Sequence, residues 1–201
     1  APQTAAPVAA WQVRTALGLS VYTLTTDYRL VHNEGDTMPG LIVDVYGSMA
    51  VLQAHSTGMH DIRQVLADAI VAESEGKITS VYDKSAESIR KMTNRKVEDG
   101  FLAGNVGECD VLENGHRFHV NAVTGQKTGF FLDQRENREL IARFAAGRDV
   151  LNMFGYTGGF SVYAAKAGAK LVHTVDSSAP SIAIAENNMK LNGFDSLEYA
   201  C

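Results

Sequence analysis

The sequence predicts an α/β protein in which a compact α+β region precedes a β-hairpin and the beginning of a parallel, doubly wound sheet. Two observations carry this prediction. An Asn-Gly pair at 114–115 separates two strand-like runs, and this pair is the favoured two-residue turn between antiparallel strands. From Asp149 onward the pattern becomes strand, glycine-rich turn, helix, strand and helix, an alternation typical of parallel sheets.

The expected domain organisation has three parts. Residues 1–19 are a lead-in or linker, rich in small residues, with a short helix that ends at Gly18. Residues 20–108 form the central α+β domain. Residues 109–201 hold the hairpin and an incomplete N-terminal part of the second domain.

Strands and one amphipathic helix account for the central domain. Residues 21–31 alternate in the manner of a strand, and the apolar runs on either side of Tyr46-Gly47-Ser48 predict a hairpin. "ITSVYD" predicts a further strand. Between them, "MHDIRQVLADAIVAE" has the helical spacing, with Gly76 beyond it as a stop. The apolar positions of that helix are Ile62, Val65, Leu66, Ala69 and Ile70.

The second half begins with the hairpin "DVLENGHRFHVNAV" and continues into a helix. Asp133, with Glu136 three residues later, predicts a capping box at the start of that helix. Its apolar stripe is expected at Leu140, Ile141 and Phe144, and Gly147 ends it. The strand, helix, strand and helix that follow are expected at residues 149–154, 160–168, 169–176 and 179–193.

Composition narrows the class of protein. A hydrophobic fraction of 45% and a charged fraction of 20% are ordinary for a soluble globular protein. No apolar run reaches the roughly 18 residues of a membrane span, so we expect no membrane contact and a cytoplasmic location. Cys109 and Cys201 are the only cysteines and form no Cys-x-x-Cys spacing. We therefore expect neither a disulfide framework nor a metal site.

Charge is unevenly distributed along the chain. The net charge of −5 argues against non-specific binding of nucleic acid, because that affinity comes mainly from neutralised phosphates. The segment "KSAESIRKMTNRK" nevertheless carries five cations against Glu87 alone. This basic island could meet an RNA backbone, or it could be a solvated loop and helix face. Its candidate RNA-binding residues are Lys84, Arg90, Lys91, Arg95 and Lys96.

The stretch "GQKTGFFLDQRENR" first suggests a phosphate loop, because it contains a Lys-Thr pair. That loop needs a glycine directly before the lysine and another five residues earlier. Gln126 and Asn121 occupy those places. The stretch is therefore not a phosphate loop of this type.

A glycine-rich turn and a later acid predict a nucleoside site instead. Gly155, Gly158 and Gly159 let the backbone turn tightly and approach a ligand closely. Asp176 ends the second strand about 20 residues later, where ribose hydroxyls are held in such folds. The alternative is that Asp176 only caps the helix that follows. The nucleoside could belong to a nicotinamide, a flavin or S-adenosylmethionine.

Four motifs together resemble a known family. "YRLVHNEGDTMPGLIVDVYG", "GQKTGFFLDQRENR", "LNMFGYTGGFSVYAAKAGA" and "VHTVDSSAPSIAIAENNMKLNG" occur in the order found in class I S-adenosylmethionine-dependent methyltransferases of large-subunit ribosomal RNA. The sequence is most similar to the cytosine-5 enzymes, which combine a PUA domain, a central α+β domain and a Rossmann-like catalytic domain. The second domain is then expected to be the first half of a Rossmann-like class I methyltransferase sheet.

The resemblance implies S-adenosylmethionine as cofactor and methylation of cytosine C5 in 23S rRNA as function. Arg135 could pair with the methionine carboxylate, and a ring from Phe130 or Phe131 could cover apolar cofactor surface. Gly158 and Ser177 join the expected cofactor site from the glycine turn and from the end of the second strand. The implied contacts are Lys127, Thr128, Phe130, Asp133, Arg135, Asn152, Phe154, Tyr156, Thr157 and Asp176.

The resemblance also leaves catalysis outside this sequence. The family's Asp-Pro-Pro loop and its cysteine nucleophile are expected downstream of Cys201, so the chain alone is expected to be an inactive fragment. Without a later strand, residues 149–154 would present an apolar edge that a homo-oligomer or another chain covers. Two alternative functions stay open: methylation of guanine in rRNA or of another acceptor, and a non-catalytic RNA-binding module.

Overall fold

The computed structural model describes residues 24–194 and 199–200. The chain divides into two compact units, each described by itself below. The first unit holds the described residues up to Val111 together with Val120–Phe130, and the second holds Leu112–His119 and the described residues from Phe131 onward. The lead-in and short helix expected at 1–19, and Cys201, lie outside the described residues.

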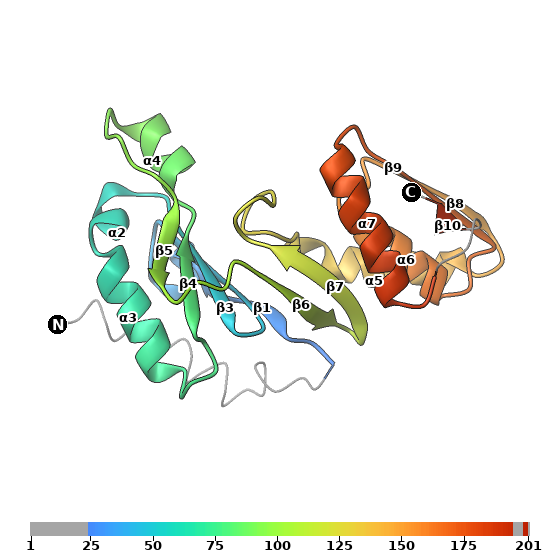
Figure 1. The fold of residues 1–201 in the computed structure, drawn as a ribbon, viewed down its shortest axis with the longest axis horizontal. Coiled ribbons are helices and arrows are strands. Elements are labelled where there is room, and N and C mark those ends of the chain that lie inside the picture. The colour runs from blue at the N-terminus through green and yellow to red at the C-terminus, as the bar shows by residue number, and fades with distance from the viewer. Residues whose placement is uncertain (1–23, 195–198, 201) are drawn as a thin grey trace. The chain divides into compact units, whose positions relative to one another are not determined.

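The first unit is built on a sheet with the strand order β1-β2-β3-β4-β5 (Figure 1). Only the β3–β4 pair is parallel among these neighbours. The predicted hairpin is confirmed, since the strands on either side of Gly47 pair from Leu41↔Ala54 to Tyr46↔Met49. The strands are β1 (Asp27–His32), β2 (Leu41–Tyr46), β3 (Met49–Ala54), β4 (Ser80–Asp83) and β5 (Gly100–Ala103).

Helices and short turns complete this unit. The predicted amphipathic helix is confirmed, but it is split at Ile62, and Val65 is 49% exposed where burial was expected. The predicted Leu66 and Ile70 are buried as expected, and together with Ala67 they pack into the core with the strands. The elements are η1 (Asn33–Asp36), α2 (Thr57–Asp61), α3 (Arg63–Glu73) and α4 (Ala86–Met92).

The described residues of the second unit form a parallel sheet and three α-helices. Its strands run in the order β10-β9-β8, and both described pairings are parallel, as the sequence predicted for the first two strands of the doubly wound sheet. α6 and α7 pack against β9, and α5 packs against α6 (Figure 1). The elements are α5 (Arg135–Ala145), β8 (Asp149–Met153), α6 (Gly159–Lys166), β9 (Leu171–Val175), α7 (Ala179–Leu191) and β10 (Tyr199–Ala200).

The hairpin of β6 (Glu108–Glu113) and β7 (His116–Asn121) is confirmed at the predicted turn. Asn114 and Gly115 have φ of 50° and 79°, the left-handed conformation that such a turn requires. Within the second unit, side chains of α7 hold β7. Asn188 Oδ1 accepts from the His119 N–H at 2.7 Å, and Asn192 Oδ1 accepts from the Arg117 N–H at 3.0 Å.

Two predictions about α5 are wrong. The chain enters this helix through a 3-10 turn, η2 (Leu132–Gln134), and the N-cap is Gln134 without a side-chain cap, so Asp133 and Glu136 form no capping box. Two of the three expected stripe residues are not buried either, because Leu140 and Phe144 are 47% and 55% exposed, while Ile141 is half-buried. The buried residues of α5 are Arg138 and Ala145. Arg138 can be buried because it forms an ion pair with the buried carboxylate of Glu113.

No helix in the described part of the chain combines the length and the apolar character needed to cross a membrane.

Candidate functional site

A sharply turned loop connects β8 to α6 in the second unit. Phe154, Tyr156 and Gly158 have φ of 58°, 48° and 74°. The Gly155 N–H donates to the carbonyl of Val175 on the neighbouring strand at 3.0 Å, so the loop is anchored at the carboxyl end of β9. Two side chains in left-handed conformation within three residues carry a strain of about 1–2 kcal/mol each. Such strain is typical of segments that shape a binding site.

The glycines of this loop are required by close packing. A Cβ on Gly155 would lie 2.4 Å from Thr174 Cγ2 on β9, and a Cβ on Gly158 would lie 2.9 Å from Ala185 Cβ on α7. The loop backbone therefore fits between β9 and α7 only without side chains at these positions. The loop therefore lies directly against the carboxyl end of the sheet, where ligands bind in open α/β folds.

Asp176 follows β9 directly and faces this loop. The Tyr156 N–H donates to its Oδ2 at 3.0 Å, and the Ser178 N–H donates to its Oδ1 at 2.9 Å. Hydrogen bonds from the backbone of Ser178 and then of Tyr156 lower the pKa of Asp176 below its ordinary value. The carboxylate is therefore ionised at neutral pH, held in place, and retains acceptor positions, because a carboxylate can accept about four hydrogen bonds.

The alternative role of Asp176 as a helix cap is taken by another residue. Ser178 is the N-cap of α7, and its hydroxyl accepts from the Ser181 N–H at 3.3 Å. Asp176 therefore holds the loop and the strand end rather than the first turn of the helix. Ser177 lies between the two and is exposed.

The other predicted site residues in and before this loop differ in exposure and in contacts. Phe154 is 88% exposed. The Tyr156 ring meets Phe131 edge to face, with the centroids 5.3 Å apart. Thr157 is buried, and its hydroxyl has no hydrogen-bond partner among the described residues. Asn152 Nδ2 donates to Ser161 Oγ on α6 at 2.9 Å. Asn152 thus anchors the strand end to the helix.

Asp133 and Arg135 are held by other protein groups. Asp133 is exposed and accepts from Gln134 Nε2 at 3.2 Å. Arg135 Nε donates to Glu113 Oε2 at 3.1 Å. The predicted pairing of Arg135 with a methionine carboxylate is therefore not needed to explain this arginine, although it stays a prediction.

Sequence reasoning missed Glu113, whose side chain is fully buried at the end of β6. Arg138 binds it through two nitrogens, with Nε–Oε1 at 2.8 Å and Nη2–Oε2 at 2.6 Å. The Tyr163 hydroxyl donates to Oε1 at 3.0 Å. Burial, and then the Glu113 charge, raise the pKa of Tyr163, so the phenol stays protonated. A carboxylate in a strand of alternating character gives no sequence signal for such a cluster.

Lys127, Thr128 and Phe130, also predicted to contact the cofactor, belong to the first unit. The Thr128 hydroxyl is buried, donates to Asp44 Oδ2 at 2.7 Å, and lies 2.8 Å from the Tyr46 hydroxyl. Phe130 is 3% exposed. Lys127 is exposed, with φ of 49°. Thr128 and Phe130 therefore serve the interior of the first unit in this structure.

Two of the five basic-island residues, Lys84 and Lys91, do not line the cavity of the first unit and are held by other groups. Lys84 Nζ donates to the carbonyls of Ala122, at 2.6 Å, and Gly125. Burial lowers the pKa of Lys84. Lys91 pairs with Glu87 one helical turn earlier on α4, at 2.6 Å. The other three residues line one cavity, which is described further below.

Cys109 is half-buried, and its thiol donates to the Tyr46 carbonyl at 3.2 Å. Burial raises its pKa to about 11. The thiol is therefore protonated at neutral pH and unsuited to nucleophilic attack. This agrees with the absence of a recognisable catalytic motif around it.

The loop and Asp176 have features that suit S-adenosylmethionine. An ionised carboxylate at the end of the second strand suits ribose hydroxyls, and exposed aromatic surface suits an adenine or a thioether. The buried Thr157 hydroxyl without a partner is a further polar group that a ligand could satisfy.

Comparisons with known proteins agree with these features. A family model described as S-adenosylmethionine-dependent methyltransferase matches residues 88–199, more than half of the chain. The chain is 40% identical over 172 residues to "Ribosomal RNA large subunit methyltransferase I" of Shewanella denitrificans and of Vibrio vulnificus. These alignments cover 85% of the chain and 43% of each relative. The chain thus spans less than half the length of these curated relatives.

Solved structures show the same relationship. A protein described as a SAM-dependent methyltransferase from Streptococcus mutans matches with a TM-score of 0.82 and 28% identity, over 97% of this chain and 50% of that chain. A methyltransferase structure in complex with SAH matches with the same values. The loop and the acid that follows β9, together with the family match across them, lead to one conclusion: the chain belongs to the S-adenosylmethionine-dependent methyltransferase family.

Proposed function

We propose that this chain is the donor-binding part of an enzyme that methylates carbon 5 of a cytosine in 23S rRNA. The observation that carries the donor site is Asp176, an ionised carboxylate fixed by the N–H groups of Tyr156 and Ser178 beside a glycine-dependent loop. The rRNA substrate is supported by the names of the relatives that are 40% identical. The choice of cytosine rests on the resemblance of the four motifs.

In this proposal the loop after β8 and the end of β9 hold S-adenosylmethionine. The cofactor supplies an electrophilic methyl group on a sulfonium sulfur. Asp176 accepts hydrogen bonds from the two ribose hydroxyls, which fixes the sugar at the end of β9. The Thr157 hydroxyl and the exposed ring of Phe154 contribute a polar contact and apolar cover. The Tyr156 ring packs edge to face against Phe131, which helps to fix the conformation of the loop.

The acceptor chemistry needs a nucleophile. Carbon 5 of cytosine is weakly nucleophilic, so a thiolate normally adds at carbon 6 to activate the ring. Cys109 is unsuited to this role, because its pKa is raised to about 11 and its thiol is bonded to Tyr46. We propose that the nucleophile lies downstream of Cys201, as the resemblance of the four motifs implies.

Mapping of the methylated nucleoside tests the proposed acceptor. The longest protein product that contains this sequence is incubated with unmodified large-subunit rRNA and radiolabelled S-adenosylmethionine, and the RNA is digested to nucleosides. We expect label in 5-methylcytidine. Label in a methylated guanosine would contradict the cytosine assignment and retain the rRNA substrate, and label in neither would contradict both.

A further inference from the structure

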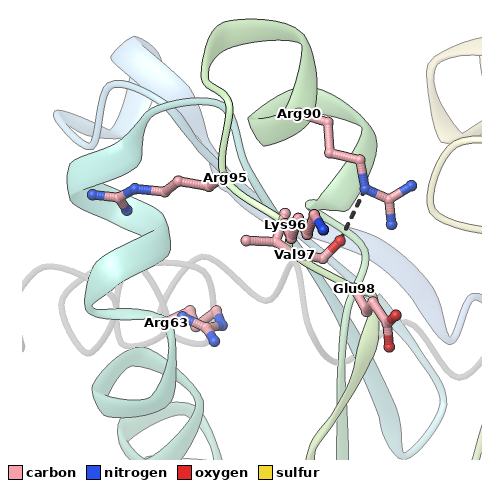
Figure 2. Close-up of a pocket in the computed structure, with 6 residues that line it drawn as sticks. All are labelled: Arg63, Arg90, Arg95, Lys96, Val97 and Glu98. Carbon is pink, nitrogen blue, oxygen red and sulfur yellow. Dashed lines mark hydrogen bonds between the residues drawn. The ribbon is translucent and has the colours of Figure 1, made fainter.

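A cavity of about 680 Å³ lies on the first unit, beside α3 and the segment between α4 and β5. Figure 2 shows its lining. Four side chains are cationic and one is acidic, and none is aromatic. The lining residues are Arg63, Arg90, Arg95, Lys96, Val97 and Glu98. Arg63 lies more than 25 positions before Arg90 in the sequence, so the basic island alone does not reveal it.

Each of the three arginines is anchored through part of its guanidinium group. Arg63 Nε lies 3.1 Å from Asp83 Oδ2, and Arg95 Nη1 lies 2.5 Å from Asp61 Oδ1. Arg90 Nε donates to the Val97 carbonyl at 2.9 Å, as the dashed line in Figure 2 shows. A guanidinium has five N–H donors. The described bonds therefore orient these groups and leave further donors for an oxyanion.

The cations of the cavity differ in how far carboxylates offset their charge. Arg63 and Arg95 have Asp83 and Asp61 as partners. The interactions described for Arg90 include a carbonyl and no carboxylate, and none is described for Lys96. Both side chains are exposed. The uncompensated charge of the cavity is therefore concentrated at these two residues, with Glu98 as the one acidic residue in the lining.

The chemistry of the lining favours phosphate over a nucleobase. Arginine forks match the oxygens of a phosphate, whereas single-stranded bases are usually held by stacking on aromatic rings. Val97 is the only apolar residue among those that line the cavity. An open, cationic and non-aromatic cavity suits a nucleic-acid backbone, which brings successive phosphates to one surface.

We infer that this cavity binds backbone phosphates of the RNA substrate through Arg90 and Lys96, with Arg63 and Arg95 as oriented supporting groups. The inference rests on the proposed RNA substrate and adds an RNA contact site formed wholly within the first unit. It also divides the basic island. Lys84 and Lys91 are engaged by backbone carbonyls and by Glu87, and neither lines the cavity.

The test measures how RNA affinity depends on salt. Binding of a fluorescein-labelled single-stranded RNA oligonucleotide is followed by fluorescence anisotropy at several salt concentrations, for the wild-type chain and for Arg90→Gln/Lys96→Gln. The matched control is Lys91→Gln, which removes one charge from the same helix outside the cavity. Each lost phosphate contact should lower the slope of log affinity against log salt by about 0.7. We expect a decrease of about 1.4 for the double variant and almost none for Lys91→Gln.

Three results would overturn the inference: no RNA binding by the wild-type chain, an unchanged slope in the double variant, or an equal loss in the control. Lys96→Glu serves as a second, single substitution at an exposed position, and thermal melting verifies that all variants fold. Calorimetry with S-adenosylhomocysteine on the same samples separates this inference from the proposed donor site. If the chain still binds S-adenosylhomocysteine but gives one of the three contradicting RNA results, only the assignment of the cavity as an RNA site is wrong.

Discussion

Glu113 is the most densely bonded acidic side chain described in the second unit. It accepts from two nitrogens of Arg138, from Arg135 and from Tyr163. Its own side chain is 0% exposed and that of Arg138 is 2% exposed. A buried ion pair is costly to form because both charges lose their hydration. Removing one partner costs still more, because the other charge then stays buried without hydration and without a counter-ion.

Replacement of Glu113 by Gln should therefore destabilise the fold strongly. The change keeps the shape and leaves Arg138 buried without its counter-ion, which costs about 3–5 kcal/mol of unfolding free energy. Denaturant unfolding measures this cost. Glu139→Gln, an exposed position on the same helix as Arg138, is the control and should change stability by no more than about 0.5 kcal/mol. Equal stability of the two variants would show that the cluster carries no net energy.

At the scale of elements, the loop between β8 and α6 depends on two separate steric conditions. Gly158 has a left-handed φ of 74° and also lies against α7, where a Cβ would come within 2.9 Å of Ala185 Cβ. Gly168, beyond α6, has a similar φ of 86° but open space around it. A comparison of substitutions at Gly158 and Gly168 therefore separates the cost of backbone strain from the cost of steric overlap.

Alanine at these two glycines should thus have different effects. Gly168→Ala should cost about 1–2 kcal/mol from the left-handed backbone. Gly158→Ala should cost that amount and a further 1–3 kcal/mol or so, because α7 has to move. Thermal or denaturant unfolding of both variants measures the difference. If Gly168→Ala were as destabilising as Gly158→Ala, the contact between the loop and α7 would not contribute.

The sequence predicted the elements whose signals are local. The run from β8 to α7 was found because apolar strands, glycines and helical spacing follow one another, and the 114–115 turn because Asn-Gly has one preferred geometry. Two of the wrong predictions concern α5, where Arg138 is buried by its tertiary partner Glu113 and the apolar Leu140 and Phe144 are exposed. Asp133 and Glu136 have the spacing of a capping box, but the chain enters α5 through a 3-10 turn.

For the same reason, only part of the candidate site has a signal in the sequence. Asp176 is recognisable because strand end and glycine loop lie about 20 residues apart in sequence. The Thr128 hydroxyl donates to Asp44, which precedes it by 84 positions, and no local pattern in the sequence reveals that partner. Glu113 and Arg63 were missed, since their partners are brought together only by folding.

At the scale of the whole molecule, one face of the parallel sheet carries exposed apolar side chains. Leu151 and Met153 on β8 are 63% and 52% exposed, and Val175 on β9 is 44% exposed. In the described sheet β8 pairs only with β9 and forms the edge. An apolar face beside an unpaired edge favours association with another chain or segment.

We expect the chain to associate with itself in a concentration-dependent way through this face. Sedimentation velocity at several concentrations measures the association. Leu151→Lys should reduce it by placing a charge on the face, whereas Val65→Lys, at an exposed apolar position on α3, should have no effect. A wild-type chain that sediments as a monomer at all concentrations would contradict this expectation.

The central claim is that Asp176 and the loop after β8 bind the methyl donor, and calorimetry with S-adenosylhomocysteine tests it most directly. Asp176→Asn keeps the shape and one acceptor oxygen but removes the charge. Because a hydrogen bond to a charged group contributes about 1.5–3 kcal/mol, we expect affinity to fall by at least roughly tenfold. Asp149→Asn, an exposed acid at the opposite end of β8, is the control and should bind like the wild type. Equal affinities for all three proteins, or no binding by the wild type, would contradict the claim.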